Sequence, residues 1–517
     1  MSKHFYLTTA IDYINGAPHL GHAYEKIGAD ALVRYKQMTG YDTWFVVGSD
    51  EHSINILTRA ESLGRDPREF CDEMSRVFQD AFAKLGIGYS VYARTSSEAN
   101  VKTAQTFIQR CYDAGYIYKG TYHGWYCTSC NRFYKQEELL QPDNCCPEHK
   151  RPVQELDEPN YFFKLSAFQD RLLEHFAQHP DWIRPESRYN EMLNVIKGGL
   201  DDFSVSRSTV KWGVPVPFDE TQVIYVWFDA LLDYVSGVGF ADNRERWETF
   251  WPCDVHVIGK DITRFHAIYW PAMLMAAGEA LPKRIFAHGF INLKGEKLSK
   301  SAGIVVDPLA LADEFGADAV RYTLLREVPF DRDGDFSIEA FQNRYNADLA
   351  NDLGNLVNRT ANMIQRYFGG TVPPGAGVRS PESGVETVDR ELISAGAGVV
   401  REIEPLMEAL DFSNALVAIW GFISRANQYL ERTSPWLLAR DEANGPRLGT
   451  VLNTAAEAVR LIAYLVLPFM PATASGIAGQ LGFALDGSSD WARWGSLPEG
   501  TRVGKVEPLF PRIDRAD

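Results

Sequence analysis

The feature that most restricts the fold is an alternation of strand and helix patterns over the first 50 residues. Residues 5–11 (FYLTTAI) are apolar and rich in β-branched side chains, and a loop with Gly and Pro follows them. A helical pattern then covers residues 20–39 and stops at Gly40, before the strand-like run 43–47 (TWFVV). Strand, helix and strand at this spacing predict a parallel βαβ unit. We therefore expect an α/β fold built on a Rossmann-like, doubly wound parallel sheet.

The pattern changes twice further along the chain. Between about residues 116 and 225 it becomes rich in aromatics, cysteines and turns, which predicts an insertion that splits the sheet domain. Strand patterns resume at 223–227, 254–259 and 286–293, and long amphipathic helical patterns such as 348–367, 416–431 and 452–467 dominate after about residue 335. The sequence thus predicts five segments: the first half of the α/β domain (1–115), the insertion (116–225), the second half (226–292), a basic loop and the region after it (293–345), and an α-helical bundle (346–517).

Length and charge narrow the class of protein. A chain of 517 residues exceeds what one core organises, so several domains are expected. The formal net charge of −16 argues against bulk attraction to nucleic acid, although a local patch of Lys and Arg could still bind RNA. The N-terminus lacks signal-peptide organisation, and the late apolar run 461–470 is too short to span a bilayer. We expect a cytoplasmic protein with no membrane partner.

Four of the seven cysteines lie in one short segment, which favours a metal site over a disulfide framework. Cys127 and Cys130 form one C-x-x-C turn, and Cys146 and His149 form a C-x-x-H turn fifteen residues later. Two such turns can place four soft donors tetrahedrally around one Zn²⁺, and four protein ligands make the site structural rather than catalytic. Cys145 competes with Cys146 as the third ligand. The alternative is a small apolar lobe with reduced thiols and no metal.

A histidine pair stands where the first predicted loop meets the first predicted helix. His19, Gly21 and His22 form an H-x-G-H motif at this helix N-terminus, where the helix dipole and free backbone N–H groups favour an anion. The two histidines can donate hydrogen bonds to one phosphate chain, and Gly21 lets a flat base approach the backbone. The alternative is two incidental histidines in a loop.

A second cluster of residues that could bind phosphates lies on the basic loop. Lys297, Ser299 and Lys300 belong to the pentapeptide KLSKS, whose two ammonium groups can clamp a triphosphate during reaction. Alone, such a pentapeptide is usually a solvated loop. Together with the H-x-G-H motif on an α/β core, it is a specific indication of nucleotide chemistry.

In these two motifs the sequence resembles class I aminoacyl-tRNA synthetases, and it is similar to the methionyl-tRNA synthetases among them along essentially its full length. Leu20 and Leu298 replace the usual Ile and Met of the motifs with apolar residues of similar volume. The resemblance implies activation of L-methionine by ATP, with Mg²⁺, followed by transfer to tRNA. It assigns catalysis to His19, His22, Lys297 and Lys300, and ATP binding to these residues with Gly21, Glu25, Gly259, Asp261 and Ser299. Positioning and charge stabilisation then carry most of the catalysis.

The resemblance also implies a methionine pocket. Asp50 aligns with the residue that holds the amino group, and Asp261 lies between the amino acid and ATP. The remaining pocket residues are carried over onto Ile11, Tyr13, Trp227, Ala230, Tyr234, Phe265 and His266. Leu231 departs from the proline of some relatives, and the alternative is that the apolar members are simply core. The insertion is too small for an editing domain, so we expect homocysteine to be handled within the active site.

The helical bundle is expected to read the anticodon. Asn355 and Arg359 lie four residues apart on one predicted helix face, and the resemblance implies that an anticodon base stacks on Trp436. The expected RNA partners are both initiator and elongator tRNA(Met), and the end of the chain soon after the bundle favours a monomer. The alternative is a bundle that serves only packing.

Three other functions remain open from the sequence. Nucleotidyltransferases also use H-x-G-H, although they are usually shorter and lack a zinc knuckle with a long bundle. A non-enzymatic RNA-binding protein on this fold would more readily have lost the lysines or histidines of the motifs. A synthetase for another amino acid is the third alternative.

Overall fold

The centre of the molecule is a parallel sheet. The computed structural model describes residues 3–128, 132–147, 150–293, 296–297, 306–374, 385–485, 487, 490–498 and 500–513. Seven strands, all paired in parallel, form the sheet in the order β2–β3–β1–β13–β14–β8, with β4 also on β3. Their bounds are β1 Lys3–Thr9, β2 Asp12–Tyr13, β3 Tyr41–Asp50, β4 Val91–Arg94, β8 Ile183–Arg184, β13 Val255–Gly259 and β14 Ile285–His288.

The strand order reverses at the middle of this sheet. Leu7 of β1 pairs with Phe45 of β3 on one side and with Val255 of β13 on the other. From β1 the chain continues outward through β3 and β4, whereas β13 continues outward through β14 in the opposite direction. Ligands of such sheets bind beyond the carboxyl ends of the strands at the reversal. The expected site therefore lies just after β1 and β13.

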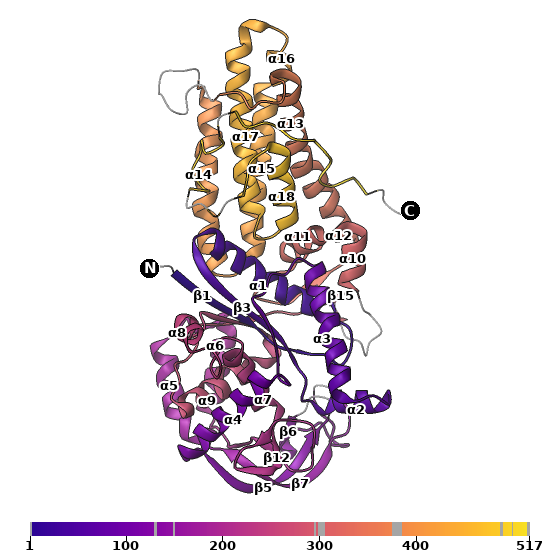
Figure 1. Cartoon of the computed structure of the whole chain (residues 1–517), viewed down its shortest axis with the longest axis vertical. Helices are drawn as coiled ribbons and strands as arrows, with labels where there is room; N and C mark the ends of the chain where they lie inside the picture. Colours follow the sequence, from indigo (N-terminus) through magenta and orange to yellow (C-terminus); the bar gives the residue numbers. More distant parts are fainter. Residues whose placement is uncertain are drawn as a thin grey trace.

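Helices cover both faces of the sheet, as the predicted doubly wound fold requires. Phe5 and Leu7 of β1 point into one core and Tyr6 into the other, because side chains alternate along a strand. The first core contains α1 (Leu20–Met38) and α3 (Pro67–Lys84), and the second contains α4 (Glu98–Asp113), α7 (Val226–Ser236) and α9 (Trp270–Ala277). Figure 1 shows these layers between the bundle and the insertion. The predicted fold class is confirmed.

The segment between the two halves of the sheet domain carries sheets of its own. A four-stranded sheet has the order β6–β5–β7–β9, and a three-stranded sheet has the order β10–β12–β11. Strand β8, which lies in the same segment, instead joins the edge of the central sheet. The bounds are β5 Ile117–Cys127, β6 Arg132–Tyr134, β7 Gln154–Phe163, β9 Phe203–Ser204, β10 Ser206–Arg207, β11 Pro215–Val216 and β12 Asp219–Ile224, with helices α5 Gln169–Gln178 and α6 Glu186–Lys197. Helix α8 (Arg244–Phe250) follows α7 in the second half of the sheet domain.

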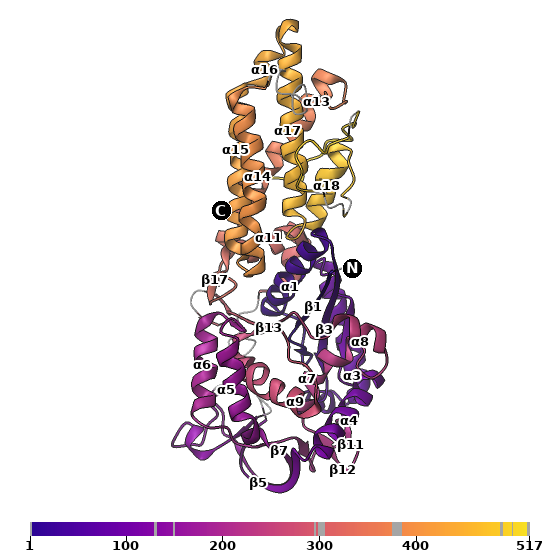
Figure 2. The same cartoon turned by 90° about the vertical axis from the view of Figure 1, so that its left-hand side faces the viewer.

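The second part of the chain is a bundle of long helices that stands on the sheet domain (Figure 2). A small sheet of β15 (Ile291–Leu293), β16 (Glu296–Lys297) and β17 (Gly334–Phe336) precedes it. The helices are α10 Pro308–Phe315, α11 Ala317–Glu327, α12 Ile338–Arg344, the π-helix η6 Tyr345–Gly354, α13 Asn355–Phe368, α14 Thr387–Glu408, α15 Phe412–Thr433, α16 Pro435–Leu438, α17 Gly445–Val466 and α18 Pro471–Leu481. Among the described residues, no helix combines the length and apolarity needed to cross a bilayer.

One buried arginine joins the bundle to the sheet domain. The Arg321 side chain of α11 is fully buried, and its Nη2 donates to Asp30 Oδ2 of α1 at 2.5 Å. The same guanidinium donates to the carbonyl of Phe469, beyond α17, at 2.7 Å and to that of Leu85, beyond α3, at 3.3 Å. Arg34 Nε donates to the same Asp30 oxygen at 2.7 Å. The base of the bundle is therefore tied to the middle of α1.

Two strand predictions require correction. The predicted strand 223–227 ends at Ile224, and Val226 begins α7, so Trp227 and Ala230 lie on a helix rather than at a strand end. Helix α7 is buried on nearly all sides and therefore lacks the amphipathic period that identifies a helix. The predicted strand 286–293 is two strands, β14 and β15, that belong to different sheets. At Gly289 between them, a Cβ would lie 2.0 Å from the backbone of Arg332, so only glycine permits this crossing.

Candidate active site

The H-x-G-H motif caps helix α1. His19 is the N-cap, and its Nδ1 accepts from the backbone N–H groups of Gly21 at 3.1 Å and His22 at 3.4 Å. In return, His22 Nδ1 accepts from the His19 N–H at 3.2 Å, which completes a capping box. Because both Nδ1 atoms are acceptors, each neutral ring carries its proton on Nε2. The two rings stack with centroids 3.7 Å apart at the helix N-terminus.

Gly21 is needed for this arrangement of the rings. A Cβ on Gly21 would lie 3.0 Å from His19 Cε1 and 3.1 Å from its Nδ1. A larger residue would therefore push the His19 ring away from the cap. The sequence suggested that glycine gives access to a base, and the contact adds a second reason for it.

A buried chain of charged side chains lies beneath this cap. Lys26 Nζ donates to Asp12 Oδ1 at 2.7 Å and to Glu25 Oε1 at 2.8 Å, and His288 Nε2 lies 2.8 Å from Glu25 Oε2. Burial acts to raise the pKa of Glu25, but Lys26 and His288 hold it below its usual range. The chain connects β2, α1 and β14. Of its members, only Glu25 was singled out from the sequence.

Aromatic rings line the opposite side of the same sheet edge. The rings of Trp227 and Phe265 stack with centroids 3.8 Å apart, and Tyr13 meets Trp227 edge-on at 6.2 Å. Phe265 belongs to the π-helix η4 (Phe265–Tyr269), a geometry often found at functional sites. Such surfaces suit an unbranched thioether, because sulfur–ring contacts stabilise by about 0.3–1.5 kcal/mol. Of the remaining apolar residues assigned to this pocket, Ala230 is buried, and Ile11 is half-buried and packs against the second core.

A hydrogen-bonded pair, Tyr234 and His266, belongs to the same predicted methionine pocket. The Tyr234 hydroxyl lies 2.7 Å from His266 Nε2, and His266 Nδ1 lies 3.0 Å from the carbonyl of Ile262. Because a carbonyl only accepts, Nδ1 carries the proton and Nε2 accepts from Tyr234. Burial lowers the pKa of His266 to about 4, so the ring is neutral at physiological pH. The pair therefore offers fixed dipoles without charge.

Asp50 is the acid best placed to meet a cation from a substrate. It ends β3, pairs in register with Tyr13 and is 3% exposed. Its Oδ1 has no hydrogen-bond partner among the described residues. Burial raises the pKa of Asp50 well above its usual range, and the carboxylates of Asp229 and Glu51 raise it further. A bound ammonium group would relieve both effects.

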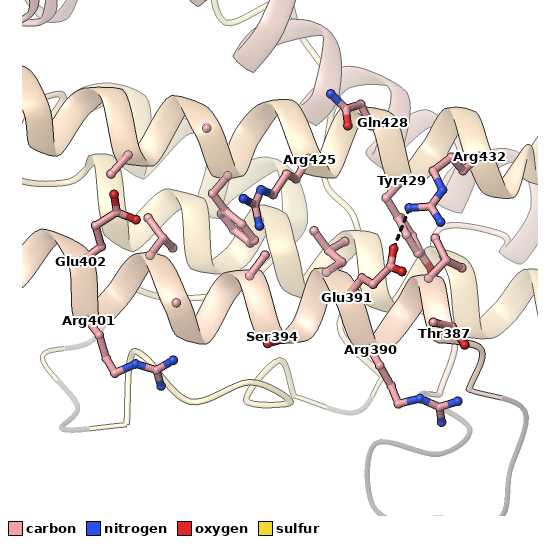
Figure 3. A pocket seen from close by; sticks show the side chains of 18 of the residues that line it. Thr387, Arg390, Glu391, Ser394, Arg401, Glu402, Arg425, Gln428, Tyr429 and Arg432 are labelled. Carbon is pink, nitrogen blue, oxygen red and sulfur yellow. Dashed lines mark hydrogen bonds and ion pairs between the residues drawn. The ribbon is translucent and has the colours of Figure 1, made fainter.

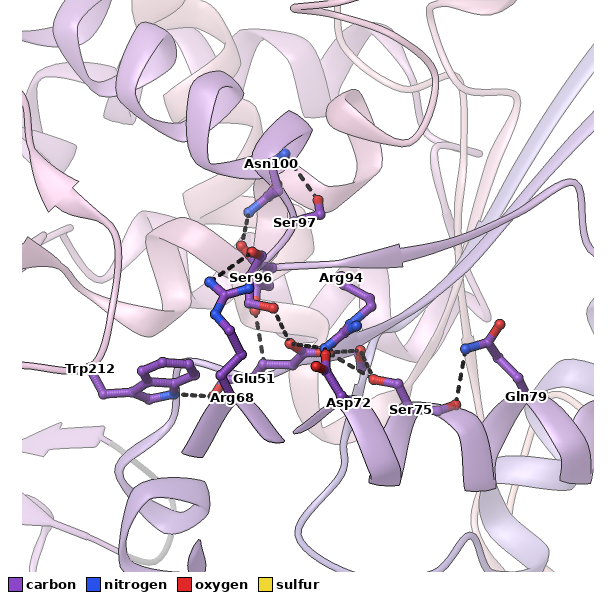
Figure 4. A network of polar contacts seen from close by, with 12 residues as sticks. Glu51, Arg68, Asp72, Ser75, Gln79, Arg94, Ser96, Ser97, Asn100 and Trp212 are labelled. Atoms are coloured by element: carbon purple, nitrogen blue, oxygen red, sulfur yellow. Dashed lines mark hydrogen bonds and ion pairs between the residues drawn. The ribbon is translucent and has the colours of Figure 1, made fainter. Parts of the chain in front are cut away.

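The residues next to Asp50 are held rigidly (Figure 4). Glu51 is fully buried and accepts from Arg94 Nε at 2.7 Å, and it also receives the hydroxyls of Ser49 at 2.7 Å and Ser75 at 2.9 Å. Burial acts to raise the pKa of Glu51, but Arg94 and the hydroxyls hold it below its usual range. The network fixes the backbone that carries Asp50. The consecutive acids 50–51 at a predicted strand end were the available signal for it.

The remaining residues predicted to bind the nucleotide lie at the end of β13 and on the basic loop. Gly259 ends β13, and a Cβ there would lie 2.7 Å from Asp261 Oδ1, so the acid folds back over the strand end. The backbone of Lys297 pairs with Asn292 of β15. Ser299 and Lys300 lie outside the described residues, as does the Lys297 side chain, so their convergence on the histidines stays a prediction.

Comparisons with known proteins agree with this geometry. The sequence model of the family "tRNA synthetases class I (M)" matches residues 5–158 and 137–361, and that of "Anticodon binding domain of methionyl tRNA ligase" matches residues 380–517. The methionine–tRNA ligase of Caldanaerobacter subterraneus is 48% identical over 99% of this chain and 80% of its own. The chain belongs to the methionyl-tRNA synthetase family.

The backbone also closely resembles solved structures of the family. The Mycobacterium tuberculosis methionyl-tRNA synthetase in complex with methionyl-adenylate is 42% identical, with a TM-score of 0.94 over 99% of this chain and 100% of that one. The free form of that enzyme is 40% identical, with a TM-score of 0.88 over 100% and 99%. The backbone described here is therefore closer to the adenylate-bound family member than to the free one.

Two of the four predicted zinc ligands can be placed in this family member. Cys127 and Cys146 are buried in one small cluster with Tyr134, Leu139 and Val153, and Cys146 Sγ lies 3.4 Å from the Tyr134 hydroxyl. Cys145 is half-buried, with its Sγ 3.8 Å from the carbonyl of Asp143. Cys130 and His149 lie outside the described residues, and the residues that are described hold no group of three metal-ligating side chains. The choice of Cys146 over Cys145 accords with this burial.

The bundle brings the three predicted anticodon residues of the family to its far end. Asn355 is exposed at the start of α13, and Arg359 stands one turn later. The Arg359 guanidinium lies over the Trp436 ring at 5.3 Å, and its Nη2 pairs with Glu431 at 2.7 Å. Residues from α13, α15 and α16 therefore meet at one surface, far along the bundle from the H-x-G-H cap (Figure 1).

A hollow of about 990 Å³ also lies in the bundle, between α14 and α15. Arg425 points into it, Arg432 pairs with Glu391 at 2.7 Å, and Arg390 and Arg401 turn away from α15 (Figure 3). None of the residues proposed to bind methionine or ATP lines it. The hollow is therefore not the reaction site of this synthetase.

Proposed function

We propose that the chain is a methionine–tRNA ligase. It activates L-methionine with ATP to methionyl adenylate, releases pyrophosphate, and transfers the methionyl group to the terminal ribose of tRNA(Met). The observation that carries the proposal is the meeting, at one edge of the sheet, of a helix cap suited to an anion and the buried carboxylate of Asp50, one oxygen of which accepts no hydrogen bond among the described residues. Such a pair of groups suits a substrate that presents an ammonium on one side and phosphates on the other.

The nucleotide binds at the cap of α1. His19 and His22 donate from Nε2 to the phosphates, and Gly21 lets the adenine approach the backbone. Glu25, Gly259 and Asp261 surround the rest of the nucleotide. Lys297, Ser299 and Lys300 clamp the phosphate chain from the loop. Mg²⁺ accompanies the ATP and neutralises charge on the phosphates that leave.

Methionine binds across the strand ends from the nucleotide. Its ammonium pairs with Asp50, and its thioether lies against Tyr13, Trp227 and Phe265. The other contacts come from Ile11, Ala230, Tyr234, Asp261 and His266. The rigid Tyr234–His266 pair fixes the depth of the pocket. Because the walls do not adapt, a β-branched side chain fits poorly.

The first chemical step needs no nucleophile from the protein. A carboxylate oxygen of methionine attacks the α-phosphorus in line, a new P–O bond forms, and the bond to the β-phosphate oxygen breaks with release of pyrophosphate. In the second step a terminal ribose hydroxyl attacks the adenylate carbonyl, and AMP leaves. The histidines and lysines stabilise charge on the phosphates in the transition state.

The anticodon is read at the far end of the bundle. Asn355 and Arg359 offer hydrogen bonds to base edges, and Trp436 offers a ring for stacking. Initiator and elongator tRNA(Met) share this anticodon, so the chain charges both. We also propose that the chain acts as a monomer in the cytoplasm, where tRNA, methionine and ATP are present.

We further propose one structural Zn²⁺ held by Cys127, Cys130, Cys146 and His149. The burial of the first and third thiols in a common cluster supports this set. Metal analysis of the purified protein tests it: wild type and Cys145→Ser should contain one zinc per chain, and Cys127→Ser and Cys146→Ser should contain much less. A wild-type protein without zinc ends the proposal.

The function as a whole is tested by ATP–pyrophosphate exchange with each standard amino acid. Methionine should support exchange far better than any other. Exchange with a different amino acid would reassign the specificity. Exchange with none of them would favour a nucleotidyltransferase or an RNA-binding protein without this activity.

A further inference from the structure

Asp12 stands beside the proposed phosphate site, although it belongs to no motif. It lies on β2, where alternation turns its side chain away from those of Ile11 and Tyr13 and towards α1. Its Oδ1 lies 3.9 Å from His22 Nε2 and 2.7 Å from Lys26 Nζ. The residue is 6% exposed, and its Oδ2 has no hydrogen-bond partner among the described residues. A buried carboxylate therefore faces one of the two motif histidines.

Lys26 supplies the charge that balances this acid. Its side chain is fully buried, and Nζ donates to the carbonyl of Ala10 at 3.0 Å as well as to Asp12 and Glu25. These three bonds use all three hydrogens of an ammonium group. Lys26 is therefore a fixed positive charge rather than a base or nucleophile.

Glu25 does not compete fully for that charge, because it has a second partner. Each nitrogen of His288 faces an oxygen, with Glu25 Oε2 and the carbonyl of Gly289 both at 2.8 Å. The Glu25 carboxylate is therefore shared between Lys26 and the His288 ring. Lys26 is thus one of two partners of Glu25, and its charge is available to keep Asp12 ionised.

We infer that Asp12, kept charged by Lys26, is a positioning residue that acts on the phosphates through His22. This inference rests on the proposed function. His22 Nδ1 accepts from the His19 N–H, so its proton lies on Nε2, on the side that Asp12 approaches. An ionised carboxylate there favours the tautomer with its proton on Nε2, which keeps Nδ1 free to accept from the His19 N–H and so maintains the cap that presents the two rings to the phosphate chain. Asp12 itself touches no substrate.

The arrangement predicts a dependence on pH. Burial raises the pKa of Asp12 to about 6, Glu25 adds to this rise, and Lys26 opposes it. Asp12 is therefore ionised at neutral pH and becomes protonated as the pH falls through about 6. The titratable and charged groups that act on it or respond to it are His22, Glu25 and Lys26 of α1, Tyr92 of β4 and Tyr234 of α7.

The test is the pH profile of kcat for methionine-dependent pyrophosphate exchange, from about pH 5 to about pH 8.5. The wild type should lose activity as the pH falls through about 6. Asp12→Asn should be at least about tenfold slower at neutral pH and should lack this acid limb, since a charge at this distance is worth that factor. Lys26→Met should shift the limb to higher pH, because the lysine lowers the pKa of Asp12.

Two further variants separate this role from a structural one. Asp12→Asn/Lys26→Met removes both buried charges, so it should melt closer to wild type than Lys26→Met alone and should still lack the limb. Asp254→Asn is the matched control, since Asp254 pairs with Lys283 at 2.7 Å at the opposite end of the sheet. Its profile should equal that of wild type.

The possible failures are distinct. A limb that persists in Asp12→Asn or in the double variant overturns the inference. A wild-type protein without methionine-dependent exchange overturns the proposed function, and this inference with it.

Discussion

The imidazole rings of His19 and His22 stack 3.7 Å apart, and each accepts a hydrogen bond at Nδ1 from a backbone N–H within the same cap. The two histidines are therefore one preorganised unit. Their donor atoms are fixed before a nucleotide arrives, which lowers the cost of orienting them during reaction.

Gly21→Ala tests this unit. The added Cβ would lie 3.0 Å from His19 Cε1 and displace the ring. The displacement should lower kcat of pyrophosphate exchange, by less than the roughly 100-fold that a misplacement of about 1 Å causes. The control is Gly398→Ala on α14, where a Cβ meets nothing within 4 Å. That variant should keep full activity, and equal rates in both variants would refute the importance of the cap geometry.

Asp50→Asn tests the proposed ammonium partner. Loss of the charge should lower kcat/KM for methionine by about 10- to 100-fold, as expected for a hydrogen bond to a charged group. The effect should appear mainly in the KM for methionine, with the KM for ATP little changed. Asp233→Asn, a buried neighbour on α7, is the matched control and should retain the KM for methionine. Unchanged methionine kinetics in Asp50→Asn would exclude this acid as the partner.

Asp233 also makes a prediction about stability. Burial raises its pKa well above the usual range, and neither carboxyl oxygen has a hydrogen-bond partner among the described residues. The folded protein thus holds a proton that the unfolded chain releases, so stability falls as the pH rises above the ordinary pKa of an aspartate. Asp233→Asn removes this loss. At about pH 8 its Tm should exceed that of wild type, and each kcal/mol of stability gained should raise the Tm by about 2–4 °C. The difference in Tm should vanish near pH 4.

Trp436→Ala should separate charging from activation. Loss of a stacking surface should lower kcat/KM for tRNA in aminoacylation by about 5- to 150-fold and leave pyrophosphate exchange unchanged. Leu437→Ala alters the neighbouring exposed side chain and should change neither activity. Equal losses of both activities in Trp436→Ala would argue against a role confined to RNA.

Arg321→Met should destabilise the junction between bundle and sheet. Removing this fully buried partner of Asp30 should cost about 3–5 kcal/mol, seen as a lower Tm. The exposed Arg432–Glu391 pair gives the matched control, Arg432→Met, with an expected cost of about 0–1 kcal/mol. A Tm in Arg321→Met close to that of the control would show that the junction is not a major source of stability.

The fold was largely predictable because its signals are local. The alternation over the first 50 residues predicts β1, α1 and β3, and the helix start at Leu20 coincides with the capped N-terminus. Helix α7 was not predictable, since a helix buried on all sides has no polar face to give it a period. The crossing at Gly289 depends on the backbone of Arg332, which is distant in sequence.

The site divides in the same way. Motif residues such as His19 and His22 lie within one turn of each other in the sequence, and the structure places them in one cap. The chain of Asp12, Lys26 and His288 could not be predicted, because its members carry no motif and meet only when three elements pack together. Asp12 and Lys26 resemble ordinary surface residues in composition. Their burial gives them a role that the sequence alone does not indicate.

Helix α1 has a mechanical consequence for the enzyme. Its N-terminus carries the histidines proposed to bind phosphate, while Asp30 in its middle is held by Arg321 at the base of the bundle. Helix α1 therefore contacts both the proposed phosphate site and the base of the bundle, which carries the proposed anticodon-binding surface. A tilt of the bundle would therefore move α1 and displace the two imidazole rings, because no loop lies between Asp30 and the histidines.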